Sequence, residues 1–243
     1  MKDYGGRPVL DVVVNGKGPF PFILDTAASG GRIGTGLVAT LGLEPVGEAR
    51  VRSGAGEAVP AKLYHLDKLE VGGLPLGGIE AIAMDPGEAD RPAVLPLKAF
   101  AGYLLTLDFA KRKITAAAGE LPPADGTSVL EYSGRLLSFP ATIGGVAATL
   151  HPDTGSPGGV TVPLEMAKSL PLAEAPRVVG SGKMVNGKLE IWGGHAQGAG
   201  ETGRSDARES ATRHDPRPPR AARRLRRPEA VRHDHRPEEQ PHP

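Results

Sequence analysis

The feature that most constrains the fold of this chain is an internal repeat. The first copy is the stretch VVVNGKGPFPFILDTAASGGRIGTGLVATLGLEP, and the second is FPATIGGVAATLHPDTGSPGGVTVPLEMAKSLPLAE. Each copy holds an apolar run, a turn with glycine, a second apolar run, an Asp-Thr dipeptide, a glycine pair and a short helical stretch. Because a repeated pattern indicates repeated substructures, we expect two lobes built on one plan.

The local pattern predicts that the body of the chain is mostly β. Apolar runs of strand length, rich in β-branched residues, occupy residues 8–14, 20–24, 104–109 and 114–117. They alternate with glycine-bearing turn signals at residues 15–16, 72–73, 77–78 and 144–145. Only residues 36–41 and 164–170 have a helical pattern, and each is a turn or two long. We therefore expect an all-β protein.

Length and charge fit this plan and argue against several kinds of partner. The chain has 243 residues, of which 39% are hydrophobic, which is enough for two compact cores. A formal net charge of +1 supplies no field that would attract nucleic acid or a membrane surface, so we expect neither partner. No apolar run reaches the length of a membrane span or a signal peptide, and the compartment therefore stays unknown from the sequence.

Metal and cofactor chemistry have little support in the sequence. The chain has no cysteine, which excludes disulfides and thiolate metal sites. No two of the seven His stand at a metal-ligand spacing within the apolar body, and a Ser/His/Asp triad has only weak candidates. We expect neither a metal nor a cofactor. The glycine pairs at residues 30–31 and 158–159 lack the flanking pattern of a phosphate loop, so they predict turns.

Composition changes abruptly near His195. Residues 196–243 contain eleven of the nineteen Arg, seven Pro and no Lys, Ile, Phe, Met, Tyr or Trp. Such a segment buries too little apolar surface to fold, so we expect a disordered tail. Its charge leaves a nucleic-acid-binding arm open as an alternative, although it has no aromatic residue to stack on bases. The predicted organisation is a first lobe at 1–119, a partial second lobe at 125–195 and the tail at 196–243.

The residues that suggest chemistry are the two Asp-Thr dipeptides. Asp25 follows the run Phe22-Ile23-Leu24, and Asp153 begins the tetrapeptide Asp153-Thr154-Gly155-Ser156. Each is placed at the exit of a strand and before a glycine-rich turn, at matched points of the repeat. An isolated Asp at such a point is commonly an Asx-turn, and this structural alternative stays open for both residues.

In these motifs the chain resembles the aspartyl peptidase family with the retropepsin-like fold, and in particular its bacterial members that join two lobes in one chain. The resemblance covers about residues 7–195. It includes YLLTLDFAKRKITA at residues 103–116, which is similar to the segment that closes a lobe in this family. It implies two β-barrel lobes of the acid protease fold, the second of them incomplete, and an aspartic endopeptidase that acts on a peptide or protein substrate.

The resemblance also implies roles for individual residues. Asp25 and Asp153 would form a dyad that shares one proton and activates water. Thr26 and Thr154 would fix the two loops by hydrogen bonds between the lobes. The remaining implied residues are Ala27 and Gly155 in the active loops, the supporting hydroxyls Ser29 and Ser156, and a flap tip at Ser53, Gly54, Ala55 and Gly56. In this family, a start upstream of Met1 would place the protein in the periplasm or outside the cell.

Three departures from the family pattern favour an alternative, namely an inactive homologue or a peptide-binding remnant. Ala27 and Pro96 stand where the family has Gly, and Pro152 replaces an apolar residue before the second Asp. If the second lobe does not function, two first lobes would pair as a homodimer and supply Asp25 twice. We also hypothesise that a frameshift between about Trp192 and Gly203 replaced the end of the second lobe, which the nucleotide sequence of the gene would test.

Overall fold

A computed structural model describes residues 1–51, 58–84, 91–130, 136–184 and 187–195. Strands dominate these residues, and helical structure is confined to two short α-helices and one 3₁₀ turn, so the all-β expectation is confirmed. The predicted flap tip at Ser53 to Gly56 and the predicted tail at 196–243 lie outside the described residues. The nucleic-acid alternative and the frameshift hypothesis for the tail therefore stay untested.

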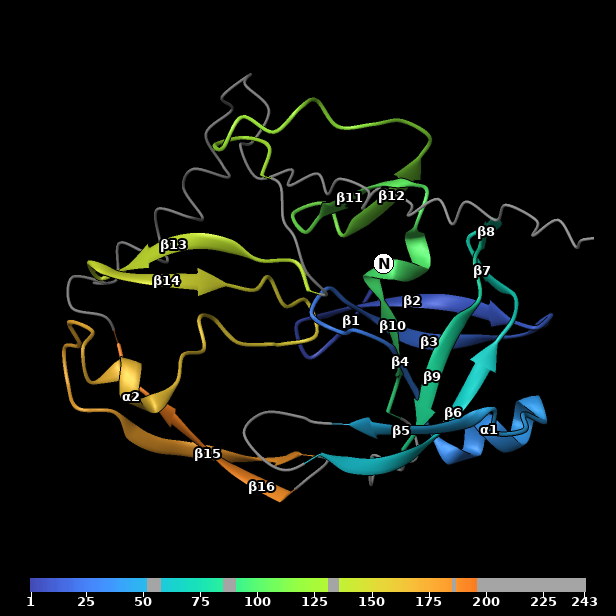
Figure 1. Cartoon of the computed structure of the whole chain (residues 1–243), viewed down its shortest axis with the longest axis horizontal. Helices are drawn as coiled ribbons and strands as arrows, with labels where there is room; N and C mark the ends of the chain where they lie inside the picture. Colours follow the sequence, from blue (N-terminus) through green and yellow to red (C-terminus); the bar gives the residue numbers. More distant parts are fainter. Residues whose placement is uncertain (52–57, 85–90, 131–135, 185–186, 196–243) are drawn as a thin grey trace, which may run out of the picture.

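The first part of the chain forms one large mixed sheet (Figure 1). Its strands lie in the order β5-β6-β9-β4-β10-β3-β2-β7-β8, and β1 pairs with β2. The ends of this order, β5 and β8, are not paired with each other, so closure into a barrel stays a prediction. The bounds are β1 Lys2–Tyr4, β2 Arg7–Val14, β3 Lys17–Asp25, β4 Gly31–Ile33, β5 Gly47–Val51, β6 Val59–Leu66, β7 Leu69–Val71, β8 Leu74–Leu76, β9 Ile79–Ala83 and β10 Ala93–Pro96.

The β2–β3 hairpin carries the first Asp-Thr dipeptide to the middle of this sheet. Asn15 and Gly16 form its turn with φ angles of 50° and 77°, a left-handed pair that matches the twist of the flanking strands. Strand β3 then runs on to Asp25 as its last residue. The parallel strand β10 lies beside it and pairs Pro96 with Asp25. The first aspartate is thus held at the end of a strand with neighbours on both sides.

The smaller elements of the first part complete its core. Helix α1 (Thr35–Leu41) ends at Gly42, whose left-handed φ of 70° is the usual way to stop a helix. The 3₁₀ turn at Leu97–Phe100 leads into the hairpin of β11 (Leu104–Asp108) and β12 (Lys113–Ala117). This hairpin is the closing segment expected at residues 103–116. The buried core residues, which include Phe22, Leu24 and Leu95, all fall between residues 9 and 121.

The second part of the chain is a set of hairpins with little burial. It contains β13 (Phe139–Ile143) paired with β14 (Val146–Leu150), helix α2 (Leu164–Ala167), and β15 (Arg177–Met184) paired with β16 (Gly187–Gly193). The elements from β13 to α2 follow the order of β2, β3 and α1 in the first part. None of the described residues beyond Leu121 belongs to the buried core, and Val178 and Trp192 are exposed.

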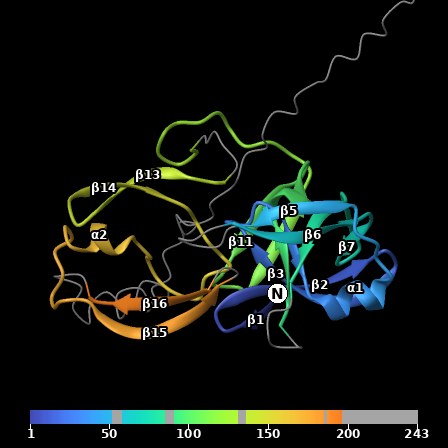
Figure 2. The same cartoon turned by 60° about the horizontal axis from the view of Figure 1, so that its bottom comes forward.

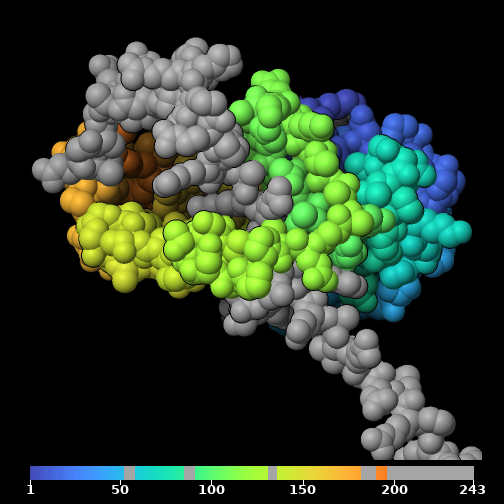
Figure 3. Space-filling model, turned by 90° about the horizontal axis from the view of Figure 1, so that it is seen from above, coloured from blue at the N-terminus to red at the C-terminus, as the bar shows by residue number. Residues whose placement is uncertain are grey.

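The two parts lie on opposite sides of the molecule. Figures 1 and 2 place β13 to β16 and α2 on one side and the large sheet with α1 on the other. The space-filling view agrees, with yellow and orange residues on one side and blue to green residues on the other (Figure 3). Because the loop after β14 returns to the large sheet, residues far apart in the sequence meet between the two parts.

Candidate active site

Asp25 is half-buried at the end of β3, and its carboxylate is held by the loop that follows. The backbone N–H of Ala27 donates a hydrogen bond of 2.8 Å to Asp25 Oδ1, and the N–H of Ala28 lies 3.4 Å from the carbonyl oxygen of Asp25. This short turn orients the carboxylate relative to its own backbone. Ala27 has a methyl group where the family has Gly, and its N–H still donates a hydrogen bond to Asp25.

Asp153 has the same local hydrogen bonds in a more exposed setting. The N–H of Gly155 donates to Asp153 Oδ1 at 2.8 Å, and the N–H of Ser156 lies 3.4 Å from the carbonyl oxygen of Asp153. However, β14 ends at Leu150, so Asp153 follows an irregular stretch of chain instead of ending a strand. The side chain is exposed, whereas Asp25 is half-buried. The two loops thus match each other in local geometry but differ in their surroundings.

Thr26 and Thr154 join the two loops by reciprocal hydrogen bonds. The hydroxyl of Thr26 accepts from the N–H of Thr154 at 3.1 Å, and the hydroxyl of Thr154 accepts from the N–H of Thr26 at 3.2 Å. The same hydroxyls donate onward, that of Thr26 to the carbonyl oxygen of Pro152 and that of Thr154 to the carbonyl oxygen of Leu24, each at 2.5 Å. Thr26 is almost fully buried, since its exposed fraction is 5%.

This exchange brings the two carboxylates to the same place. Gly155 lies so close to them that a Cβ on this residue would stand 2.6 Å from Asp25 Cγ and 3.1 Å from Asp153 Oδ1. A side chain at position 155 would therefore clash with the first carboxylate, which explains why the second loop has Gly there. The structure thus brings together Asp25, Thr26, Asp153, Thr154 and Gly155 from the two copies of the repeat.

The proximity of the carboxylates changes the acidity of Asp25. Burial raises the pKa of Asp25 above its ordinary value, and the neighbouring charge of Asp153 raises it further. The N–H groups of Ala27 and Ala28 and the guanidinium of Arg32 act in the opposite direction. The net effect is a raised pKa, which is expected when two carboxylates compete for ionisation in a partly buried site. Asp25 therefore tends to hold the proton.

Two arginines near the site were not predicted from the sequence. Arg7, the first residue of β2, donates from Nε to the carbonyl oxygen of Gly155 at 2.7 Å. It thereby ties the second loop to the first part of the chain. Arg32 lies half-buried in β4 close enough to Asp25 to affect its pKa. In the sequence each of these arginines follows a glycine at or near the start of a strand, and this pattern does not indicate which residue the side chain contacts.

The two predicted supporting serines have modest contacts. Ser156 Oγ accepts a hydrogen bond of 3.4 Å from the N–H of Gly158, which stays within its own loop. Ser29 is exposed, and its side chain makes no hydrogen bond with the part of the chain that is described. Neither serine contacts the carboxylates through a hydrogen bond to a described residue, so their roles stay predictions.

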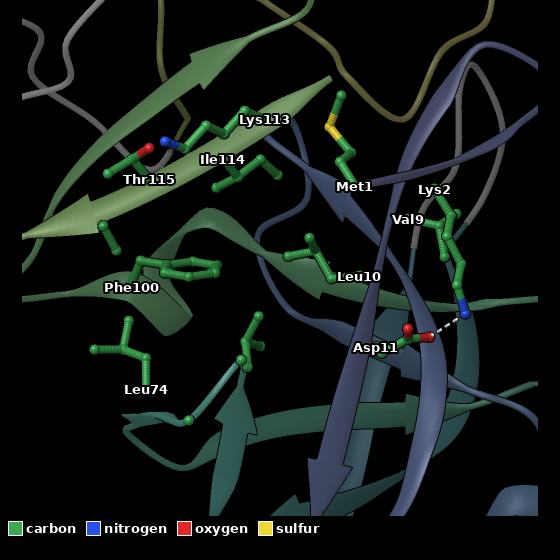
Figure 4. A pocket seen from close by; sticks show the side chains of 14 residues that line it. Met1, Lys2, Val9, Leu10, Asp11, Leu74, Phe100, Lys113, Ile114 and Thr115 are labelled. Atoms are coloured by element: carbon green, nitrogen blue, oxygen red, sulfur yellow. Dashed lines mark hydrogen bonds and ion pairs between the residues drawn. The ribbon is translucent and has the colours of Figure 1, made fainter. Parts of the chain in front are cut away.

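The departures from the family pattern do not separate the loops. Pro152 lacks an N–H, but its carbonyl oxygen is the group that Thr26 bonds. Pro96 is fully buried in β10 beside Asp25, where it ends the strand. The two departures are therefore compatible with the contacts between the loops. A separate pocket of about 630 Å³ is lined by residues such as Leu10, Leu74, Phe100 and Ile114 and by neither Asp25 nor Asp153 (Figure 4).

Among the described residues, no group of three or more His, Asp or Glu could hold a metal ion. None of the described helices is long and apolar enough to cross a membrane.

Comparison with known proteins identifies the first part of the chain. Residues 10–99 match a family model described as aspartyl protease. The match includes Asp25 and the first active loop and ends before Asp153. No curated protein matches the chain.

Proposed function

We propose that this chain, which belongs to the aspartyl protease family through residues 10–99, is an aspartic endopeptidase whose dyad is Asp25 and Asp153. The observation that supports the proposal best is the reciprocal bonding of Thr26 and Thr154, because it draws the two carboxylates together across the two parts of the chain. An isolated Asx-turn would not require such a partner. The family match supports peptidase activity, and the pairing of the loops supports this choice of residues.

The chemistry follows from the unequal surroundings of the two carboxylates. Asp25, whose pKa is raised, carries the shared proton and acts as the acid, and Asp153 acts as the base. As water attacks the carbonyl carbon of a peptide bond, Asp153 takes a proton from the water and Asp25 gives its proton to the carbonyl oxygen. The tetrahedral intermediate then collapses, a proton passes to the amide nitrogen, and the C–N bond breaks. No cofactor is needed for these steps.

The decisive test uses an unstructured protein substrate between about pH 3 and pH 8. The purified chain should cleave it, and Asp25→Asn and Asp153→Asn should each lower kcat by at least about a thousandfold, because either change removes one of the two proton-transfer groups. Glu48→Gln, a change on the exposed strand β5, is the matched control and should cleave as the parent does. Cleavage that survives Asp25→Asn would contradict the proposal.

A second candidate function is a peptide-binding homologue without catalysis. It is favoured by the second part of the chain, where none of the described residues is in the buried core and Asp153 is exposed. A transition-state analogue of the pepstatin type distinguishes the two, because its hydroxyl group is bound between both carboxylates. Tight binding that is lost in Asp25→Asn supports the enzyme. Peptide binding without analogue binding supports the remnant.

A further inference from the structure

Arg32 lies on the same face of the large sheet as the first aspartate. Directly paired residues of neighbouring strands share a face, and Val94 of β10 pairs both with Ile23 of β3 and with Arg32 of β4. Asp25 is two residues beyond Ile23 on β3, so it points to that face as well. The opposite face belongs to the core, where Leu24 and Ile33 have no exposed surface.

Arg32 and Asp25 are close enough on this face to interact. Two strand spacings, about 10 Å, and the two-residue offset along β3, about 7 Å, put their Cα atoms about 12 Å apart, a gap that an extended Arg side chain spans in part. Arg32 and Asp25 in fact affect each other electrostatically, since each favours the charged form of the other. The guanidinium therefore lies near enough to the Asp25 carboxylate to interact with it.

Arg32 is a half-buried charge without an ionic partner in the described part of the chain. It makes no ion pair and no side-chain hydrogen bond with any described residue, although burial and the nearby Arg91 both disfavour its charge and lower its pKa. Val94 and Ile82, its neighbours in the ladder, have apolar side chains and offer the guanidinium neither a hydrogen bond nor an ion pair. A partly desolvated guanidinium is favourable when an oxyanion binds it, and a carboxylate fits its planar fork.

We propose that Arg32 binds a carboxylate of the peptide substrate next to the scissile bond, and so gives the enzyme a preference for acidic peptides. This inference rests on the proposed function, because it takes the face that carries Asp25 as the substrate face. The carboxylate is either an Asp or Glu side chain or the free carboxyl terminus of the peptide. The first source makes Arg32 a specificity determinant for internal cleavage, and the second favours cleavage close to a chain end.

A digest of a mixed peptide library tests the preference without a chosen substrate. Product sequencing should show Asp and Glu enriched about tenfold beside the cleaved bonds. The enrichment should disappear in Arg32→Gln and persist in part in Arg32→Lys, which keeps the charge. Arg112→Gln, the same change in the turn between β11 and β12, should leave it intact. A library with amidated carboxyl termini distinguishes the two sources, because only terminal recognition is lost on amidation.

A binding measurement separates a failure of this inference from a failure of the proposed function. Asp25→Asn is titrated with fluorescent pools of short peptides, one with Glu and Asp and one with Gln and Asn in their place. The acidic pool should bind about tenfold more tightly, and Arg32→Gln in the same background should remove the difference. If this holds while the parent protein cleaves nothing, the inference stands and the proposed function fails. Equal binding of the two pools, or a preference unchanged by Arg32→Gln, overturns the inference.

Discussion

At the scale of single residues, the two aspartates share one sequence motif but differ in their burial. Both accept a 2.8 Å hydrogen bond from the N–H two residues later, so the local sequence gives them the same turn. Asp25 ends a strand inside the large sheet, however, whereas Asp153 follows an irregular stretch and is exposed. The raised pKa of Asp25 arises from its surroundings and not from the motif.

The raised pKa of Asp25 predicts how stability depends on pH. A carboxyl whose pKa is higher in the folded state than in the unfolded chain is destabilising once it ionises. The penalty is absent below the ordinary carboxyl pKa, grows as pH rises toward the raised folded value, and is complete above it. Asp25→Asn should therefore raise Tm by a few degrees at neutral pH and leave Tm nearly unchanged near pH 3.

Thermal unfolding of both proteins across this pH range measures the effect. Glu48→Gln, on an exposed strand, serves as the control and should show no such pH-dependent gain. If Asp25→Asn raised Tm equally at both ends of the pH range, ionisation of Asp25 would not be what destabilises the folded protein.

At the scale of elements, the hairpins and helix α1 agree with expectation, whereas helix α2 is shorter than expected. The runs at 8–14 and 20–24 become β2 and β3, and the expected closing segment becomes β11 and β12. Helix α2, in contrast, ends at Ala167, although the pattern predicts helix to residue 170. Leu170 precedes Pro171, and a residue before proline is disfavoured in helical conformation. The helix therefore ends before Leu170.

The hydrogen bonds between the two active loops predict that loss of the Thr26 hydroxyl lowers the free energy of unfolding. Thr26→Val keeps the shape of the side chain but leaves the N–H of Thr154 and the carbonyl of Pro152 without their partner. We expect a loss of about 1–3 kcal/mol in the free energy of unfolding, measured by denaturant titration. Thr40→Val is the control, because that hydroxyl bonds Gly36 on the exposed face of α1 and should cost less than about 0.5 kcal/mol.

A double-mutant cycle sharpens this test. If Thr26 and Thr154 act as one unit, Thr26→Val and Thr154→Val together should cost clearly less than the sum of the single changes. Additive losses would mean that the loops are held independently of each other.

At the scale of the whole molecule, one chain supplies both carboxylates. Thr154 and Gly155 contact the first part of the same chain through Thr26 and Arg7. The arrangement of a first lobe at 1–119 and a partial second lobe at 125–195 stays a proposal, as does the homodimer that would supply Asp25 twice. The contacts within the chain favour a site that is complete in the monomer.

Sedimentation combined with mutation distinguishes these arrangements. We expect the active species to sediment near the monomer mass of 25.2 kDa and to lose activity in Asp153→Asn. In a homodimer with two copies of Asp25, the active species would have twice this mass and Asp153→Asn would remain active. The latter pair of results would contradict the single-chain site.

The sequence alone determines the strands, their glycine turns and the positions of the two Asp-Thr dipeptides, because these depend on periodicity and on residues close together in the chain. Residues 10–99 of the sequence also match a family model described as aspartyl protease. The tertiary structure alone decides that Arg7 holds Gly155 and that Arg32 lies on the face of Asp25. The meeting of Thr26 and Thr154 across 128 positions was implied beforehand only by the family resemblance. Burial and long-range contacts arise only when distant segments pack, and no local pattern encodes which partner a side chain will meet.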